Sequence, residues 1–186
     1  QFYASSEWAS GYPAATGIGT QHGGILVDFN AVKGGIEIIP LDNDWQRAAH
    51  VYSDEVLISH RTDAEKGTPK FERGKSLSDH QQEMIYISGT AAIRGEESIV
   101  TGDVLVQTEI TLENIQHLIG LEEGREKLPE HSGKLELLRV YLKHEEDAKI
   151  VKEDMDKLCP DVPIVYLYAD VCREELLVEI EGIAYL

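Results

Sequence analysis

The chain has 186 residues, 42% of them hydrophobic, and a formal net charge of −17 at pH 7. This size suits one domain over residues 1–186, and the excess of acidic residues argues against a nucleic-acid partner. No apolar run approaches the roughly 18 residues of a membrane-spanning helix, so no membrane partner is expected. The two Cys and seven His show neither disulfide nor metal-ligand spacing, which predicts no metal and favours a cytoplasmic location.

The first part of the chain, residues 1–82, is predicted to hold short strands and a long loop. Its first residue is Gln rather than Met, which suits a processed or truncated form and leaves room for an upstream domain. We predict strands at Gly24–Ala31 and Ile36–Leu41, joined by a hairpin turn at Lys33–Gly35. Residues 42–82 are predicted to be irregular, and a loop of this length usually serves a function.

Residues 83–186 form the predicted core, in which strands alternate with two helices. Crossover helices between strands cover a sheet face. The expected fold class is therefore α/β (α+β), a two-layer sandwich of a mixed sheet with both helices on one face. The predicted elements are a strand at Glu83–Ser88, a helix within Gly102–Gly120, a polar loop at Glu122–Gly133, a strand at Leu135–Lys143, a helix at Glu145–Leu158, a strand at Pro163–Val171 and a last strand from Leu176.

The last strand alternates apolar and acidic residues. Val178 and Ile180 point to one face, and Glu179 and Glu181 point to the other. Two neighbouring carboxylates repel each other, so we expect them on a solvated face, in a subunit interface or in a site. A solvated face is the simplest of these three interpretations.

The sheet face that the helices leave open is predicted to combine charges of both signs with aromatic rings. Such a face suits neither water nor a dry core. We therefore expect it to pack between subunits, in a trimer with clefts between the sheets. The residues assigned to this face by alternation are Arg139, Tyr141, Lys143, Tyr166, Tyr168, Glu179 and Glu181.

Four motifs of the core follow one another at a recognisable spacing. They are Ile87–Ile93, Gly102–Thr108 with Leu112–Ile115, Arg139–Leu142 and Val178–Glu181. In order and spacing they resemble the YjgF/RidA superfamily, also called the endoribonuclease L-PSP family. The resemblance implies a YjgF/chorismate-mutase-like fold and a homotrimer whose ligand sites lie between subunits.

Further motifs extend the match over nearly the whole chain. They are Ala15–Gly19, Pro40–Leu41 with Asn43, Gln46, Ala49 and Tyr52, then Pro69, Phe71 and Arg73, then Ser88–Ala91 and Ala169–Glu181. These look like the C-terminal half of chorismatases, which contain two such halves. Chorismatases remove pyruvate from chorismate, either by hydrolysis or with aromatisation to a hydroxybenzoate. The resemblance therefore implies a hydrolase or lyase for a small anionic metabolite, working without a cofactor.

The resemblance points to a glutamate in the last strand as the general acid. We assign this role to Glu179, with Glu181 as the fallback. A nearby like charge raises the pKa of one carboxyl of such a pair, so Glu181 would tune Glu179.

Other side chains are candidates for binding the substrate. Positive charge for its carboxylates is expected from Arg73, Arg139, Lys143 or Arg173, with Arg favoured for bidentate geometry. Pairing of Arg139 and Lys143 with acids at an interface is the alternative. The remaining candidates are Tyr141 and Tyr168 for the ring of the substrate, and the backbone of Thr16 and Gly17 for a carboxylate.

Two other functions stay open. The first is a RidA-type enamine or imine deaminase with altered specificity. RidA deaminases carry a substrate-binding Arg where this chain has Val165, and an Asn where it has Lys152. The second is a trimeric small-molecule-binding protein without catalysis.

Overall fold

The computed structural model describes residues 11–21, 23–57, 67–79, 81–120 and 134–186. The loop predicted at Glu122–Gly133 lies outside these ranges. The described residues form a six-stranded mixed sheet in the order β1-β2-β3-β8-β6-β7, with a separate hairpin of β4 and β5. The strands are β1 (Glu37–Leu41), β2 (Gly74–Ser78), β3 (Glu83–Thr90), β4 (Ile93–Arg94), β5 (Glu97–Ser98), β6 (Lys134–Leu142), β7 (Ile164–Tyr168) and β8 (Val178–Tyr185).

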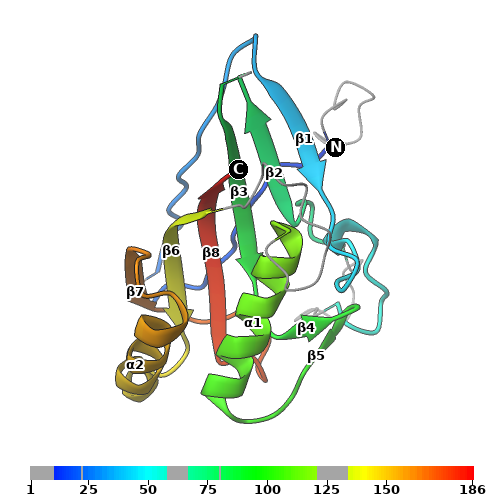
Figure 1. Ribbon diagram of the computed structural model, residues 1–186. Helices are drawn as coiled ribbons and strands as arrows, with labels where there is room; N and C mark the ends of the chain where they lie inside the picture. The colour runs from blue at the N-terminus through cyan, green and yellow to red at the C-terminus, as the bar shows by residue number, and fades with distance from the viewer. Residues whose placement is uncertain (1–10, 22, 58–66, 80, 121–133) are drawn as a thin grey trace.

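Two α-helices cover one face of this sheet, as predicted (Figure 1). They are α1 (Val104–Leu118) and α2 (Ala148–Leu158), and the 3-10 turns are η2 (Ala49–Val51) and η3 (Glu145–Asp147). Asp103 caps α1, its carboxylate accepting from the N–H of Leu105 at 2.9 Å. The core between the layers includes Ile85, Ile87, Leu112, Ile115, Leu138, Val140, Leu142, Val151, Met155, Val178 and Ile180.

The β6–β7 and β6–β8 registers decide which residues share the open face. Arg139 pairs with Glu181 and Tyr141 with Glu179, so these four residues lie on the face opposite the helices, as alternation predicts. The placement of Tyr166 and Tyr168 there was wrong. Tyr166 pairs with Val140 and Tyr168 with Leu142, both core residues, so the two rings belong to the helix side of β7.

The N-terminal part differs from the prediction in two ways. Residues 24–31 form no strand, so the predicted hairpin at Lys33–Gly35 is not formed. Strand β1 pairs with β2 instead. The run 24–31 contains the β-branched residues Ile25 and Val27, but it pairs with no strand among the described residues, and Ile25 is 93% exposed. Conversely, β2 lies within the predicted loop of residues 42–82. Its sequence Gly-Lys-Ser-Leu-Ser has a single large apolar residue and therefore no alternation to detect.

A crossing segment, residues 13–19, runs over the face of the sheet opposite the helices (Figure 1). At one end the N–H of Glu72 donates to the carbonyl of Pro13 at 3.0 Å. In the middle, the N–H of Ala15 donates to Oγ of Ser88 at 3.0 Å. At the other end Gly19 and Asp170 exchange two backbone hydrogen bonds of 2.9 and 3.1 Å. The crossing segment therefore connects the start of β2 to the end of β7 and passes the strands between them.

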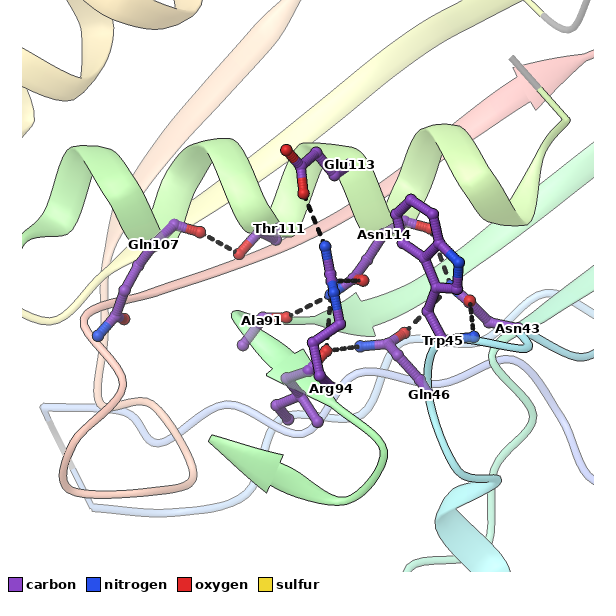
Figure 2. A network of polar contacts seen from close by, with 10 residues as sticks. Asn43, Trp45, Gln46, Ala91, Arg94, Gln107, Thr111, Glu113 and Asn114 are labelled. Atoms are coloured by element: carbon purple, nitrogen blue, oxygen red, sulfur yellow. Dashed lines mark hydrogen bonds and ion pairs between the residues drawn. The ribbon is translucent and has the colours of Figure 1, made fainter. Parts of the chain in front are cut away.

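A buried polar network holds the loop after β1 against α1 and β3 (Figure 2). The amide of Asn43 donates to the carbonyl of Asn114 at 2.9 Å, and the amide of Gln46 donates to Oγ1 of Thr90 at 3.0 Å. These groups are buried, and each buried donor that finds a partner avoids a desolvation cost of about 1–3 kcal/mol. The network fixes the loop that carries Tyr52 toward the open face.

Candidate active site

Glu179 lies near the start of β8, beneath the crossing segment, and is 5% exposed. Its carboxyl group rests against the backbone of Gly89, because a Cβ built at Gly89 would overlap Oε1 of Glu179 and lie 2.6 Å from Cγ2 of Thr16. Oγ1 of Thr16 accepts the N–H of Gly89 at 2.9 Å. Glycine at this position thus allows the carboxyl, the bare backbone and the crossing segment to meet.

The environment of Glu179 favours its protonated form. The pKa of the carboxyl is raised to about 8, first by burial and then by the negative charge of Glu181, while the positive charge of Arg73 acts in the opposite direction. Glu179 is therefore mostly protonated at neutral pH and can donate a proton.

Arg73 and Arg173 bring two buried guanidinium groups to the same region. Each guanidinium carbon lies 5.5 Å from the ring centroid of Tyr52, within the range of a cation–π contact. Nη2 of Arg73 also donates to the hydroxyl of Tyr52 and, at 2.7 Å, to the carbonyl of Arg47. Nε of Arg73 is buried and has no hydrogen-bond partner among the described residues. Two cations around one ring, beside a mostly neutral acid, favour the binding of an anion.

Glu96 of the β4–β5 hairpin connects Arg173 to the loop of Tyr52. Its carbonyl accepts from Nη1 of Arg173 at 2.8 Å. Its carboxylate accepts from the N–H of Ser53 at 2.8 Å and from the Ser53 hydroxyl at 2.5 Å, and these bonds lower its pKa. Glu96 thus binds both Arg173 and Ser53, the residue next to Tyr52.

Glu181 lies in a different environment. Its Oε1 accepts from Nη1 of Arg139 at 2.6 Å and from the hydroxyl of Tyr141 at 2.8 Å. The hydrogen bond that Arg139 donates to Glu181 raises the pKa of Arg139. The pKa of Tyr141 is raised first by burial and then by its own hydrogen bond to Glu181. Arg139 is therefore engaged in an ion pair with an acid of its own chain.

The remaining predicted site residues are Lys143, Gly17 and Tyr168, and each lies in surroundings different from those of Glu179. Nζ of Lys143 donates to the backbone carbonyls of Glu174 and Arg173, at 2.7 and 3.4 Å. Gly17 is exposed, and a Cβ built on it meets no atom of the described part of the chain within 4 Å. Tyr168 lies at the edge of the sheet on the face away from Glu179.

The structure thus brings Glu179, Arg73, Arg173 and Thr16 together and leaves Tyr168 apart. Tyr52, which completes this group, was named in the motif but not as a site residue. The signal that could have found it is its place in a long irregular segment beside an Arg-containing motif, since functional residues concentrate on such loops.

Neither a metal nor a membrane site is found in the described part of the chain. No group of three or more His, Cys, Asp or Glu among these residues could hold a metal ion. None of the described helices is long and apolar enough to cross a bilayer.

Comparisons with known proteins identify the relatives of this chain. No family model matches it. It is 35% identical over 179 residues to a chorismatase of Streptomyces rapamycinicus, covering 92% of this chain and 50% of the relative. It is 33% identical over 185 residues to a 3-hydroxybenzoate synthase of Streptomyces hygroscopicus, with the same two coverages. The chain spans about half the length of the curated relatives it matches.

A crystal structure of a chorismatase has 29% sequence identity and a TM-score of 0.69, over 92% of this chain and 50% of that one. The chain is a YjgF-like protein of the chorismatase type. Its fold is shared by the yeast protein YEO7, with 11% identity and a TM-score of 0.54 over 80% of this chain and 98% of that one. An endoribonuclease L-PSP from Entamoeba histolytica shares it too, with 12% identity and a TM-score of 0.54 over 81% of this chain and all of that one.

Proposed function

We propose that this chorismatase-type chain removes pyruvate from chorismate or from a similar enolpyruvyl ether. The observation that carries the proposal is a buried carboxyl group, Glu179, whose pKa is raised to about 8 and on which the buried guanidinium of Arg73 acts. The buried guanidinium of Arg173 contacts the same tyrosine ring, Tyr52, as Arg73. Chorismate has two carboxylates and one enol ether. Binding it requires positive charge, and cleaving it requires an acid.

Arg73 and Arg173 would bind the carboxylates of the substrate. A guanidinium presents two parallel N–H groups to a carboxylate, which gives both strength and orientation. The formal charge of the chain is −17, so an anionic substrate needs such a local concentration of positive charge. Tyr52 would orient both guanidinium groups, because it contacts each of them.

Glu179 would act as the general acid. In hydrolysis, its proton moves to the methylene carbon of the enolpyruvyl group, and the carbon bonded to the ether oxygen becomes electrophilic. Water adds to that carbon and returns a proton to the carboxylate of Glu179. The resulting hemiketal then breaks its bond to the ring oxygen. Its hydroxyl loses a proton as the ketone of pyruvate forms, and the ring oxygen takes up a proton to become the ring alcohol. Proton transfer by a positioned acid of this kind contributes about 10²- to 10⁴-fold to a rate.

The decisive experiment is incubation with chorismate, with pyruvate measured by a coupled lactate dehydrogenase assay. Chromatography of the ring product then distinguishes hydrolysis, which leaves a dihydroxycyclohexadiene acid, from aromatisation, which leaves a hydroxybenzoate. We expect pyruvate release that Glu179→Gln abolishes. Pyruvate at the level of the Glu179→Gln background, from a folded wild-type protein, would contradict the proposal.

The guanidinium roles can be tested separately from turnover. In the Glu179→Gln background, where substrate is not consumed, Arg73→Met and Arg173→Met should each weaken chorismate binding by about 10-fold or more. Isothermal titration calorimetry measures this. Unchanged affinity in both variants would remove the arginines from the substrate site.

A deaminase of the RidA type is less well supported by the geometry. Val165, the position of the substrate-binding Arg in RidA deaminases, lies opposite Arg139 in the β6–β7 register. That arginine bonds to Glu181, so it does not replace the missing one. Ammonia release from a 2-iminoacid, without pyruvate release from chorismate, would favour the deaminase.

We also propose that further copies of the chain cover the open face, in a homotrimer. Val165 and Leu167 on this face are 45% and 40% exposed, and Ile25, Leu26 and Phe29 are exposed as well. Burying such groups between subunits is favourable by about 25 cal/mol per Å² of apolar surface. Light scattering after size exclusion should give the mass of three chains, and a monomer at micromolar concentration would contradict it.

A further inference from the structure

A short turn connects two of the groups proposed to act on the substrate. This linking turn, residues 173–177, starts at Arg173 and leads directly into β8, which carries Glu179. The N–H of Leu176 closes it by donating to the carbonyl of Arg173 at 3.2 Å. The side chain of Leu176 is fully buried, which fixes the middle of the turn.

Gln107 of α1 binds the linking turn from the helix side. Its side chain extends away from α1 (Figure 2) and is fully buried. Its Nε2 donates to the carbonyl of Glu175 at 3.0 Å, and its Oε1 accepts the N–H of Leu177 at 2.8 Å. The carboxamide thus satisfies a backbone acceptor and a backbone donor on either side of Leu176, as a neighbouring strand would.

Lys143, at the end of β6, binds the same turn through its ammonium group. Nζ donates to the carbonyl of Glu174 at 2.7 Å. The backbone N–H of Lys143 donates to the carbonyl of Leu177 at 3.0 Å, which joins the end of the turn to β6. Consecutive backbone groups of the linking turn are therefore fixed by two different elements.

We propose that Gln107 and Lys143 are positioning residues that hold the linking turn and thereby set the placement of Arg173 relative to the carboxyl of Glu179. This inference deepens the proposed function and rests on it, because it concerns the acid and a cation of the same site. Neither residue needs to touch the substrate. Lys143, predicted from the sequence as a substrate-binding residue, acquires a different role.

Loss of these contacts should change the protonation of Glu179. In Gln107→Met both hydrogen bonds disappear at similar side-chain length, the turn loosens, and water gains access to the buried carboxyl. The titratable groups that act on Glu179 or feel its charge are not themselves substituted in this variant. They are Arg73, Tyr141, Cys172 and Glu181. We therefore expect the pKa of Glu179 to fall by about one unit or more toward its ordinary value.

The test is a ¹³C NMR titration of carboxyl-labelled protein, with the signal of Glu179 assigned by its absence in Glu179→Gln. Lys143→Met should shift the pKa of Glu179 in the same direction as Gln107→Met, by a smaller amount. At pH 7 the protonated fraction would fall from about nine-tenths to about one-half for a shift of one unit. The pH profile of pyruvate release should move downward with it, with kcat more affected than KM.

Thr108→Val is the matched control, because Thr108 is equally buried on α1 but its hydroxyl bonds to the carbonyl of Val104 and not to the turn. It should leave the titration of Glu179 unchanged. Should Gln107→Met not fold, Lys143→Met decides the question. A lower melting temperature with an unchanged pKa of Glu179 would overturn the positioning role. Wild-type protein that releases no pyruvate would overturn the proposed function instead, because the titration does not depend on substrate.

Discussion

Glu179 and Glu181 are two residues apart on one face of one strand, yet their surroundings have little in common. Around Glu181 the groups are complementary, since Arg139 and Tyr141 both donate to a single carboxylate oxygen. Around Glu179 the crossing segment packs over the buried carboxyl, and the positive charge of Arg73 only partly offsets the effect of burial. The contrast lies in tertiary structure: a distant segment packs over the carboxyl of Glu179, whereas donors from the neighbouring strand β6 bond to that of Glu181.

The two regions also depend on each other. The negative charge of Glu181 raises the pKa of Glu179. The charge of one carboxylate therefore favours the neutral form of its neighbour, an arrangement often found in acid–base sites. Each of the following predictions tests the contrast between them.

The largest expected effect separates the two glutamates directly. Glu179→Gln should lower pyruvate release by about 10²- to 10⁴-fold, because the amide has no proton to donate. Glu181→Gln should keep most of the activity, since it leaves the acid in place. Steady-state kinetics with chorismate at pH 7 measure both. Equal losses of pyruvate release in the two variants would contradict the different roles given to Glu179 and Glu181.

Crowding the carboxyl of Glu179 should have the next largest effect. In Gly89→Ala the new methyl group would overlap Oε1 of Glu179 and press on Thr16, so we expect activity to fall at least 10-fold and stability to drop by about 1–3 kcal/mol. Gly67→Ala is the control, because a Cβ there meets no atom of the described residues within 4 Å. Full activity in Gly89→Ala would show that the close packing around this carboxyl is dispensable.

The buried acid should make the folded protein less stable as the pH rises. The pKa of Glu179 is about 8 when folded and near 4.5 when unfolded, so the folded state holds a proton that the unfolded state releases between these values. The contribution of Glu179 to stability is thus fully present below pH 4.5. It declines by up to about 1.4 kcal/mol per pH unit and is lost above pH 8. The difference in urea unfolding between wild type and Glu179→Gln should show this slope, and parallel curves would refute it.

The smallest effect probes the coupling between the carboxylates. Glu181→Gln removes the charge that raises the pKa of Glu179, so the titration midpoint of Glu179 should fall by less than about one unit. The pH at which pyruvate release is half-maximal should move by the same amount. Glu145→Gln, on exposed η3, offers a charge-matched control. A midpoint that does not move would leave burial as the sole cause of the raised pKa.

Much of the core and half of the site could be predicted from the sequence. Alternation assigned Glu179, Glu181, Arg139 and Tyr141 to one face because each lies in a strand with a regular apolar partner face. It misplaced Tyr168 because both faces of β7 are rich in apolar and aromatic residues, so period 2 carries little information there.

The rest of the site depends on long-range contacts that no local pattern encodes. Tyr52 meets Arg73 and Arg173 because the polar network and Glu96 fix its loop. Glu179 becomes buried because Thr16, near the other end of the described chain, reaches Gly89. The sequence predicted two acids on one face, but the difference between them arises from tertiary structure.

The crossing segment also has a consequence for folding kinetics. It joins β2 to β7 and covers β8, so its contacts close some of the longest loops in the chain. Such contacts form late in folding, because the entropy cost of closing a long loop must be met before the contact stabilises the chain. Until it docks, Glu179 stays hydrated and ionised. Refolding should therefore take up a proton from solvent in its last phase, so that a pH indicator in weak buffer would report the moment at which the acid becomes competent.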